Sequence, residues 1–389
     1  MQSEPPYRNA AMLASGASAL PDSINRWSMT QNVDSLHKAS VAHGGGLAAP
    51  YIAMAEAEAG ELAHTHYGLE GDLLRFATEK DDTFRVDARD GKRYVLKVAN
   101  PSEAPQEIDL QLKVLQHIEQ VDPSLPVPRV LPDKGGSYCP FVVDRAAQRR
   151  QLRLMNYLEG APLDSTPSSA REREHVGEML ARLRLAMAGF AHPADSRQLP
   201  WDVKHLAALT PLLDKVADSG QQRRLHAGLA RFQEIEPALR TLRSQVLHND
   251  FSKSNIVVDH GRPDFVTGII DFGDTVRTAI AVDVSTALLN QLPRLPAYRT
   301  SDDLLADGRD VLRGYLKVAD LMHDELALIP HLVMARVVAR ALITLWRARM
   351  FPDNAHYILR NTEPGWAQLD WFLSHSIQDI SAMLVPSGE

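Results

Sequence analysis

The stretch that decides the fold reads Val246-Leu247-His248-Asn249-Asp250-Phe251-Ser252-Lys253-Ser254-Asn255-Ile256-Val257-Val258. Its polar centre has the spacing H-x-D-x-x-x-x-N, and apolar residues flank this centre on both sides. Short apolar runs of this kind predict two buried strands with a polar loop between them. The loop therefore presents the side chains of Asp250 and Asn255 from a fixed scaffold.

The same spacing occurs in the catalytic loop of phosphoryl-transfer enzymes. There the aspartate orients the substrate hydroxyl and accepts its proton, while the asparagine crosses the loop to bind Mg²⁺. We predict these two roles for Asp250 and Asn255. We interpret His248 as a buried histidine that ties the loop together, not as a reacting group.

A second carboxylate follows on the next predicted hairpin. The segment Gly268-Ile269-Ile270-Asp271-Phe272-Gly273-Asp274 ends an apolar strand with Asp-Phe-Gly. In the D-F-G element this aspartate holds Mg²⁺ against the nucleotide phosphates. The order and spacing of Asp250, Asn255 and Asp271 together predict a phosphoryl-transfer centre with Asn255 and Asp271 as metal ligands.

A cation is needed on the nucleotide side, and Lys97 is the candidate. It lies in Tyr94-Val95-Leu96-Lys97-Val98, a strand-like run that resembles the V-A-I-K element. An acidic or polar residue of the following helix should pair with this lysine. Glu107, Asp109 and Gln111 are the candidates; Gln111 has the best helical phase but carries no charge, so the choice stays open.

The expected glycine-rich phosphate loop is absent, because Lys80-Asp81-Asp82-Thr83-Phe84 contains no glycine. We predict that Thr83 and nearby backbone N–H groups cover the phosphates instead. The segment Leu154–Gly160 reads as a crossover between two lobes. Its backbone around Asn156 and Leu158 is expected to meet the purine edge.

The composition is consistent with an enzyme that acts on small molecules. The chain has 389 residues, a net charge of -7 and one cysteine, Cys139. A mildly acidic chain lacks the basic footprint that nucleic-acid binding needs. We saw no apolar run of the roughly 18 residues that a membrane span needs, and a single cysteine fits a reducing compartment. We therefore predict a cytoplasmic enzyme without nucleic-acid or membrane partners.

The order of predicted elements defines an α+β fold. Residues 1–48 are expected to form a flexible tail, 49–155 a β-rich N-lobe and 156–389 a mainly helical C-lobe, together a bilobal protein-kinase-like fold. Helices are predicted at 51–67 (ending at Gly68), 105–119, 171–190, 201–218 and 221–242, and three more after the hairpin. Strands are predicted at 83–86, 93–98, 141–143, 152–157, 255–258 and 266–270.

The chain resembles the aminoglycoside phosphotransferase and choline kinase superfamily, and within it the hydroxylysine kinase branch. The resemblance covers roughly residues 50–375. It rests on 81–86, 94–100, Leu199-Pro200-Trp201-Asp202, 247–250, 268–274, Trp346-Arg347-Ala348 and Pro352-Asp353-Asn354. It implies a kinase that uses ATP or GTP with Mg²⁺ and phosphorylates a hydroxyl of a small amine-bearing compound. It also implies Asp250 as base, Asn255 and Asp271 as metal ligands and Lys97 as phosphate contact.

A departure from the branch lies inside the catalytic loop. Phe251-Ser252-Lys253-Ser254 replaces its usual filler, and Lys253 adds a positive charge near the γ-phosphate.

A zwitterionic amino alcohol needs an anionic contact for its ammonium group and a cationic contact for its carboxylate. Asp274, Trp201 and Asp202 are candidates for the ammonium side; a Trp-Asp pair at a helix start can equally be an anchor followed by a cap. The candidates for the carboxylate side are Arg336, Arg340 and Arg347, which follow one another at helical spacing. The same spacing also occurs on arginine-rich helix faces that are simply exposed to solvent. Asp283 is expected to brace the catalytic loop.

Two other functions stay open. One is an aminoglycoside phosphotransferase or homoserine kinase-like enzyme, and the other is a pseudokinase that binds nucleotide without turnover. The sequence selects neither ATP nor GTP, and it leaves the acceptor and the oligomeric state undefined.

Overall fold

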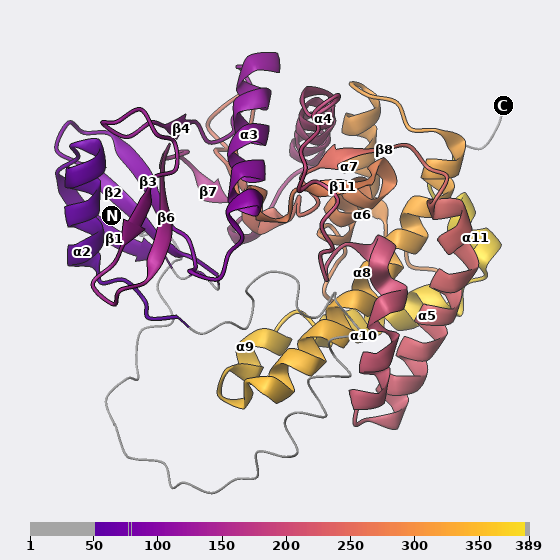
Figure 1. The fold of residues 1–389 in the computed structure, drawn as a ribbon. Coiled ribbons are helices and arrows are strands. Elements are labelled where there is room, and N and C mark those ends of the chain that lie inside the picture. Colours follow the sequence, from indigo (N-terminus) through magenta and orange to yellow (C-terminus); the bar gives the residue numbers. More distant parts are fainter. Residues whose placement is uncertain (1–50, 77, 79, 386–389) are drawn as a thin grey trace, which may run out of the picture. The chain divides into compact units, whose positions relative to one another are not determined.

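The computed structural model describes residues 51–76, 78 and 80–385. The predicted tail, residues 1–48, lies outside the described residues. The chain divides into two compact units (Figure 1): the described residues up to Ile108 with Pro128–Tyr157, and Asp109–Val127 with the residues from Leu158 onward. The predicted boundary put all of 49–155 in the first unit. Residues 109–127 fall instead in the second unit.

The first unit is built on one antiparallel sheet with the strand order β1-β2-β3-β6-β4 and with β5 paired to β6. Its elements are α2 (Glu56–Leu62), the π-helical turn η2 (Ala63–Tyr67), β1 (Gly71–Phe76), β2 (Asp82–Ala88), β3 (Arg93–Val98), β4 (Val130–Leu131), β5 (Phe141–Val143) and β6 (Arg149–Asn156). Helix α3 (Pro105–Val121) crosses the boundary between the units.

The helix predicted from residue 51 starts later, at Glu56, and ends at Gly68 as expected. Gly68 has a φ of 72°, which glycine adopts without steric cost. Strand β1 was not predicted, since its exposed and half-buried residues show no clean alternation.

The sheet of the first unit separates an apolar face from a polar one. Phe84, Leu96 and Leu154 lie opposite one another on β2, β3 and β6 and join a core cluster that includes Ala59 and Ala63. Side chains alternate along a strand, so the neighbouring residues of the same strands project from the other face. That polar face carries Lys97.

The second unit is mainly helical and contains two small sheets, β10-β9-β7 and β11-β8. Its strands are β7 (Ala161–Pro162), β8 (Ser244–Leu247), β9 (Ile256–Val258), β10 (Val266–Ile269) and β11 (Val276–Ala279). Its 3-10 helices are η3 (Leu163–Ser165), η4 (Val203–Lys215), η5 (Lys253–Asn255), η6 (Phe272–Asp274) and η7 (Pro352–Asn354). Its α-helices are α4 (Ala170–Ala186), α5 (Ser219–Leu239), α6 (Ile280–Leu289), α7 (Ala306–Leu316), α8 (His323–Met350), α9 (Ala355–Leu359), α10 (Glu363–Ser374) and α11 (Ile377–Ala382).

Two predictions about the second unit are wrong in detail. The helix expected at 201–218 is the 3-10 helix η4, which contains Pro211. Proline lacks the N–H that an α-helix would use there. Six α-helices, not three, follow the β9–β10 hairpin within the described residues, because short loops interrupt the apolar stretches. The broader prediction of a β-rich first part and a helical second part is confirmed.

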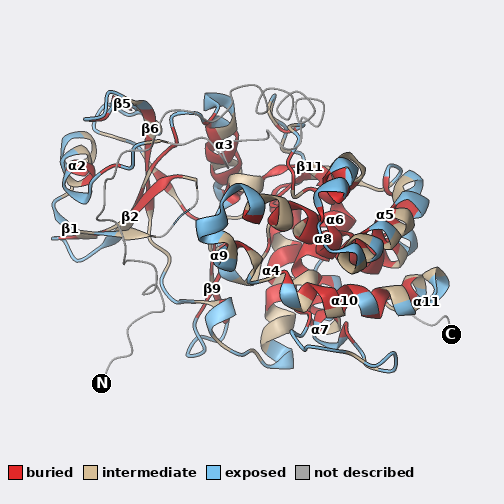
Figure 2. Ribbon diagram, turned by 90° about the horizontal axis from the view of Figure 1, so that it is seen from below, coloured by how far each residue is buried: buried red, intermediate tan, exposed pale blue. Residues whose placement is uncertain are grey.

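Helix α8 forms the core of the second unit. An 18-residue window of this helix has a mean hydropathy of 1.8, long and apolar enough to cross a membrane, but 89% of the window is buried inside the protein. Figure 2 shows α8 and α6 as mostly buried ribbons. Burial in the core accounts for the apolar composition of α8. The cytoplasmic location stays a prediction.

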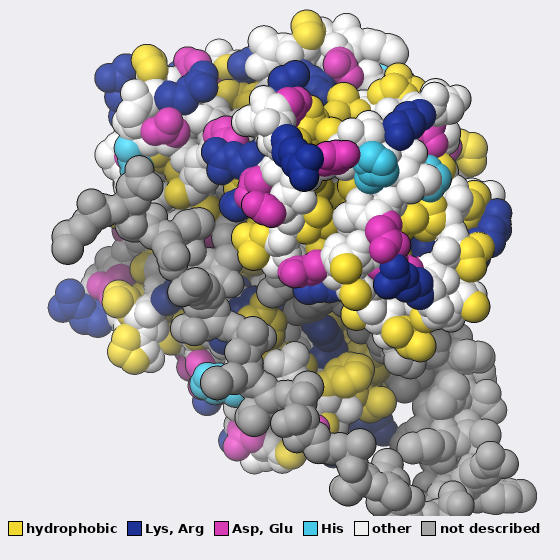
Figure 3. All heavy atoms as spheres, turned by 90° about the vertical axis from the view of Figure 1, so that its left-hand side faces the viewer, with side chains coloured by type: hydrophobic (Ala, Val, Ile, Leu, Met, Phe, Trp, Pro, Cys, Tyr) yellow, Lys and Arg dark blue, Asp and Glu magenta, His cyan; other side chains and the backbone are white. Residues whose placement is uncertain are grey.

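One face of the molecule, shown in Figure 3, mixes acidic and basic side chains instead of gathering one sign. Exposed ion pairs of the first unit illustrate the mixture, for example Arg145 with Glu61 and Arg89 with Glu70. Such pairs contribute little to stability.

Helices α4 and α7 approach each other unusually closely. A Cβ atom placed on Gly177 of α4 would lie 1.8 Å from the carbonyl oxygen of Val311, and one on Gly314 of α7 would lie 1.9 Å from that of Glu174. Backbone atoms cannot move aside as a flexible side chain can. The pair of helices therefore requires glycine at both positions.

We expect Gly177→Ala to lower the free energy of unfolding by about 1–3 kcal/mol or more, through overpacking. Gly60→Ala is the matched control, because Gly60 is also helical and its new Cβ would lie 3.6 Å from Leu73, an ordinary contact. Alanine is favoured over glycine in a helix, so the control should be neutral or slightly stabilising. Denaturant unfolding measures both; equal effects of the two changes would contradict the close approach.

Candidate active site

The loop between β8 and β9 is fastened at both ends to the end of β10. The Nε2 atom of His248 lies 3.0 Å from the carbonyl oxygen of Ile270, and the Nδ1 atom of His248 accepts the N–H of Asp250 at 3.3 Å. At the other end, the N–H of Ile270 donates to the carbonyl oxygen of Asn255 at 2.9 Å. Since Nδ1 accepts, the imidazole proton sits on Nε2. Asp271, the next residue, is thereby placed beside the loop.

A third bond holds the loop from the side of α6. Asp283 is 2% exposed, and its Oδ1 accepts the N–H of Asn249 at 2.7 Å. Asn249 has a φ of 61°, and both polar atoms of its side chain are buried with no hydrogen-bond partner in the described part of the chain. Backbone strain and unpaired polar atoms each cost free energy, and functional sites are where such costs gather.

Asp250 and Asn255 contact each other directly. The amide nitrogen of Asn255 donates to Oδ2 of Asp250 at 2.7 Å and to the carbonyl oxygen of Asp250 at 3.0 Å. Both bonds use the NH₂ group of the amide. The amide oxygen of Asn255 is therefore left to face another group, such as a cation.

Asp271 begins a tight turn that the sequence alone did not fully explain. It has a φ of 63°, and its Oδ1 accepts the N–H of Gly273 at 3.1 Å. Arg197 encloses this turn, donating to the carbonyl oxygens of Gly273 and Thr275. We did not predict Arg197; its position beside the Leu199–Asp202 motif was the one available signal.

Acidic side chains accumulate around this loop, and one arginine faces them. Burial and the neighbouring Asp271 raise the pKa of Asp250 to about 6, while Arg336 opposes the rise. Burial, Asp250 and Asp271 likewise raise the pKa of Asp274 to about 6, against Arg197 and Arg336. Arg336 extends from α8, is 8% exposed and also donates to the carbonyl oxygen of Trp201. It thus supplies positive charge beside a group of carboxylates.

The donor atoms at this place suit Mg²⁺. Within the described residues there is no group of three His, Cys, Asp or Glu side chains that could hold a metal by themselves. Mg²⁺ is commonly held by one or two carboxylates together with substrate phosphates and water. The Asp271 carboxylate and the Asn255 amide oxygen fit that smaller requirement.

The predicted nucleotide residues of the first unit lie on or beside its sheet. Lys97 is half-buried on β3, opposite Thr83 on β2, which is 3% exposed. The side chain of Asn156 is used internally, since its Oδ1 accepts the N–H of Arg129 at 2.6 Å.

The helical partner of Lys97 is not among the bonds of the described residues. Lys97 itself makes no ion pair or hydrogen bond in that part of the chain. Asp109 is engaged with His192 at 3.0 Å, which explains its place on α3. Gln111 is 7% exposed, and both it and Glu107 have contacts of their own. Which of these two residues serves Lys97 stays a prediction.

Comparison with known proteins identifies the family. A family model described as "Phosphotransferase enzyme family" matches residues 73–321, more than half of the 389 residues. This chain belongs to the phosphotransferase enzyme family. The prediction of an enzyme that transfers phosphoryl groups is confirmed, as is the resemblance stated from the motifs.

Individual relatives are more distant. The chain is 23% identical to a hydroxylysine kinase of Mus musculus over 336 residues, covering 81% of this chain and 88% of the relative. It is 27% identical to a homoserine kinase of Paraburkholderia phymatum over 221 residues, covering 55% of this chain and 64% of the relative. A solved structure of the amicoumacin kinase hAmiN, in complex with AMP-PNP, Ca²⁺ and Ami, aligns with a TM-score of 0.60 at 17% identity over 84% of this chain and 94% of that one. The last match shows the fold, so the predicted kinase-like fold is confirmed.

The structure corrects one predicted substrate residue of this phosphotransferase. Asp202 is fully buried, caps η4 by accepting the N–H of Lys204 at 3.2 Å, and pairs with the Lys204 ammonium at 3.0 Å. Thr278 donates to the same carboxylate at 3.1 Å. The cap, which the sequence left open as an alternative, therefore occupies the side chain of Asp202. Trp201 is half-buried, and its carbonyl group is held by Arg336.

A second arginine of α8, Arg340, lies near Arg336. The pKa of Arg340 falls to about 10 through burial and through the nearby Arg294 and Arg336. Its guanidinium donates to Oε1 of Gln368 at 3.0 Å, and its Nε is buried with no hydrogen-bond partner among the described residues. Arg347, half-buried on the same helix, has contacts of its own. Crowded like charges of this kind favour an anionic ligand.

Two remaining residues are placed as follows. Leu158 packs against Gly268, so its side chain fills the sheet of the second unit. Lys253 is half-buried, and burial lowers its pKa. Its charged neighbours are Asp307, Arg173, Arg294 and Asp164, not Asp250. The expectation that it adds charge at the γ-phosphate has no support from these neighbours.

The phosphotransferase should show opposite pH effects for two buried carboxylates. Burial raises the folded-state pKa of Asp283 from the ordinary aspartate value of 3.8 to about 6, so ionised Asp283 destabilises the fold increasingly between about pH 4 and pH 6. Asp283→Asn removes that cost. We expect the variant to gain stability over the wild type as pH rises, by on the order of 2–3 kcal/mol at pH 8.

Asp195 provides the matched control. Burial alone would raise its pKa, but bonds from Arg277, Ser196 and the backbone outweigh this and lower it. Asp195→Asn should therefore lose stability at pH 8 and lose less near pH 4. Thermal unfolding at pH 4.5 and pH 8 compares the variants; the same trend for both would refute the assignment.

Proposed function

We propose that this phosphotransferase transfers the γ-phosphate of ATP or GTP to a hydroxyl group of a small amine-bearing compound, and that a hydroxylysine-like amino acid is its acceptor. One observation carries the proposal: Asp250, Asn255 and Asp271 are brought together by the bonds to Ile270. Their side chains are those that phosphoryl transfer to a hydroxyl needs.

Each residue has a distinct role in this proposal. Asp250 orients the acceptor hydroxyl and takes its proton, and its bond to Asn255 fixes the direction of the carboxylate. A raised pKa near 6 keeps Asp250 mostly ionised at neutral pH while leaving it a better proton acceptor than an ordinary aspartate. Lys97 holds the nucleotide phosphates. His248 and Asp283 position the loop without touching the substrate.

Mg²⁺ fits the same arrangement. Asp271 and the amide oxygen of Asn255 would hold it, with the remaining positions filled by phosphate oxygens and water. When bound, the ion would neutralise charge on the transferred phosphoryl group. The neighbouring Asp250 and Asp274 make this region strongly negative, which favours a divalent cation.

The charges around the loop support a zwitterionic acceptor. Asp274, beside Asp250 and Asp271, can accept an ammonium group. Arg336 faces Asp250 and Asp274, and Arg340 lies beside Arg336, so a carboxylate can bind within reach of the same site. An α-amino acid with a side-chain hydroxyl carries all three groups. The names of the relatives, hydroxylysine kinase and homoserine kinase, describe acceptors of this kind.

A homoserine-like acceptor is the second candidate, and the arginine group favours it as well, because homoserine also has a carboxylate. An aminoglycoside is disfavoured by the same group, since a polycationic drug would meet Arg336 and Arg340. The third possibility, a nucleotide-binding pseudokinase, is opposed by the presence of every residue that the chemistry needs.

We expect Asp250→Asn to lower turnover by roughly 10²–10⁴-fold, the usual contribution of a general base, while nucleotide binding is retained. A panel of hydroxylysine, homoserine, ethanolamine, choline and aminoglycosides with ATP and with GTP measures turnover. Asp259→Asn is the control, because Asp259 is exposed on the turn after β9. Full activity of Asp250→Asn would refute the catalytic assignment, and nucleotide binding with no turnover on any acceptor would favour the pseudokinase.

The arginine group gives a separate test of the acceptor class. We expect Arg340→Met to raise the KM for hydroxylysine by roughly tenfold to a hundredfold, through the loss of a charge-assisted bond. The KM for the decarboxylated diamine of hydroxylysine should stay unchanged. Arg349→Met is the matched control, since Arg349 lies exposed at the end of the same helix. Equal effects on both acceptors would show that Arg340 does not bind the carboxylate.

A further inference from the structure

A row of three polar side chains crosses the sheet of the first unit. Thr83 of β2 lies directly opposite Lys97 of β3, and Lys97 lies directly opposite Arg153 of β6. Directly opposed residues of neighbouring strands project from the same face, with Cβ atoms about 4.5–5.5 Å apart. The row therefore stands on the polar face, away from the apolar cluster around Phe84 and Leu96.

Arg153 is buried but incompletely bonded. Its side chain is 4% exposed, and one guanidinium nitrogen, Nη2, donates to Oδ2 of Asp81 at 3.0 Å. The other, Nη1, is buried with no hydrogen-bond partner in the described part of the chain, and so is the hydroxyl of Thr83. Buried donors without acceptors are rare in native proteins and call for an explanation such as an absent ligand.

A second arginine on the same strand, Arg150, differs in the acidic groups around its guanidinium, although its Nη1 also makes no hydrogen bond in the described part of the chain. Arg150 projects from the opposite face, where Nε and Nη2 donate to the carbonyl oxygens of Ala99 and Val98 at 2.7 and 3.0 Å. Its Nη1 pairs with Asp82 at 2.7 Å. Nη1 of Arg150 thus lies between two carboxylates, at 2.7 Å from Asp82 and 3.6 Å from Asp144, whereas Nη1 of Arg153 has neither a hydrogen bond nor an ion pair among the described residues.

The charge of the row is positive. Lys97 and Arg153 contribute two positive charges and Asp81 one negative charge, which leaves one positive charge for a ligand. All three side chains of the row can donate hydrogen bonds, and phosphate oxygens only accept them. Arginine suits phosphate because its two nitrogens can bond two oxygens at once.

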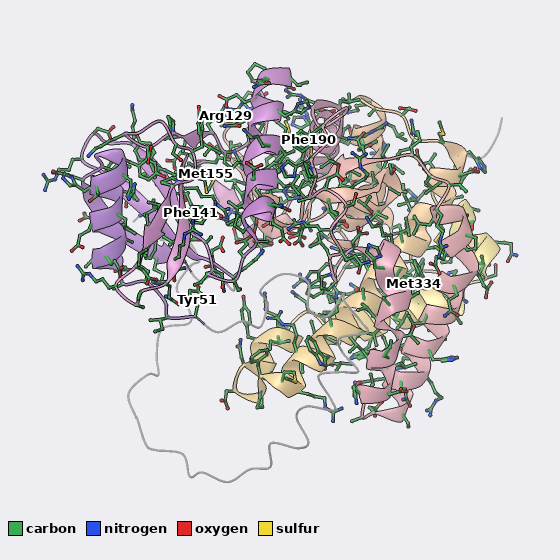
Figure 4. All side chains as sticks on the ribbon, viewed as in Figure 1. Tyr51, Arg129, Phe141, Met155, Phe190 and Met334 are labelled. Atoms are coloured by element: carbon green, nitrogen blue, oxygen red, sulfur yellow. The ribbon has the colours of Figure 1, made fainter. Side chains whose placement is uncertain are left out.

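We propose that Arg153 is a second phosphate-binding cation of the nucleotide site, acting beside Lys97, with the hydroxyl of Thr83 donating to the same phosphate chain. The inference rests on the proposed function, because it requires a nucleoside triphosphate as donor. The proposal explains how the site can bind phosphate although residues 80–84 contain no glycine. Side-chain donors on the sheet replace the backbone N–H groups of a glycine-rich loop. Figure 4 labels Met155, which lies two residues after Arg153 and projects from the same face of β6.

Calorimetric binding of ATP, GTP, ADP, adenosine and tripolyphosphate tests the proposal. Arg153→Gln should weaken the binding of ATP or GTP, ADP and tripolyphosphate by roughly tenfold to a hundredfold and leave adenosine unchanged. Arg149→Gln is the matched control: it removes the same charge from the same face of β6, where the exposed Arg149 stacks on Phe141 at 3.6 Å from the ring centroid. This control should bind all five ligands like the wild type.

Asp81→Asn separates ligand binding from a purely structural ion pair. If Arg153 binds phosphate, removing its acidic partner leaves ATP affinity equal or higher. If the ion pair only holds the loop, Asp81→Asn weakens ATP as much as Arg153→Gln does, and the proposal is overturned. Should Arg153→Gln fail to fold, Arg153→Lys takes its place, with a smaller loss for ATP and none for adenosine expected; an unchanged ATP affinity overturns the proposal.

The wild-type measurement keeps the two proposals apart. A wild-type protein that binds no nucleoside triphosphate refutes the proposed function. If the wild-type protein binds ATP or GTP, but Arg153→Gln binds it equally tightly, only the proposed role of Arg153 is refuted.

Discussion

The two peptide groups around Ile270 carry the interactions on which the site depends. The N–H of Ile270 bonds to Asn255, and its carbonyl group bonds to His248, so the residue that follows β10 contacts both ends of the loop between β8 and β9. One of these bonds joins two backbone groups, and the other uses the buried imidazole of His248, so the relative positions of Asp250, Asn255 and Asp271 rest on short bonds to one residue. Asp271 follows that residue directly and has a positive φ. Fixation of this kind gives phosphoryl transfer the positional accuracy it needs.

The same region also contains several features that cost folding free energy. Asp250, Asp274 and Asp283 each have a pKa raised to about 6, chiefly by burial. Asn249 has a left-handed backbone, and its side-chain amide finds no hydrogen-bond partner among the described residues. A fold under selection for stability alone would remove such features. Arg336 offsets part of the cost, since its charge favours the ionised form of all three carboxylates. Arg336 also lies near Arg340, so the arginine that stabilises the ionised carboxylates is itself part of a cluster of arginines.

The catalytic loop could be read from the sequence because its determinants are local. The segment from Val246 to Asp274 contains the loop, the hairpin and the three side chains to which we assign the chemistry, and short-range spacing was enough to select them. Arg197 was not predicted, and Arg336 was predicted only as a contact for a substrate carboxylate. Both arginines reach the carboxylates of the loop from segments far away along the chain, and short-range spacing does not indicate that target. Asp202 shows a different limit of sequence-based prediction, in which one local pattern has two possible roles. A carboxylate before a helix fits both a cap and a ligand, and only the bonds to Lys204 and Thr278 decide for the cap.

The sheet of the first unit shows how one strand can serve structure and ligand at once. On β6, Arg150 and Arg153 are three residues apart and therefore face opposite sides of the sheet. Arg150 donates to two backbone carbonyl groups, and its Nη1, which makes no hydrogen bond in the described part of the chain, lies beside the carboxylates of Asp82 and Asp144. Arg153 meets one carboxylate oxygen and keeps a donor unpaired, next to a lysine that has no partner in the described part of the chain. A sequence pattern cannot separate these two arginines, because both are basic residues within an apolar strand. The difference lies in the acceptors that the neighbouring strands present on each face, and that difference decides which arginine can receive a phosphate.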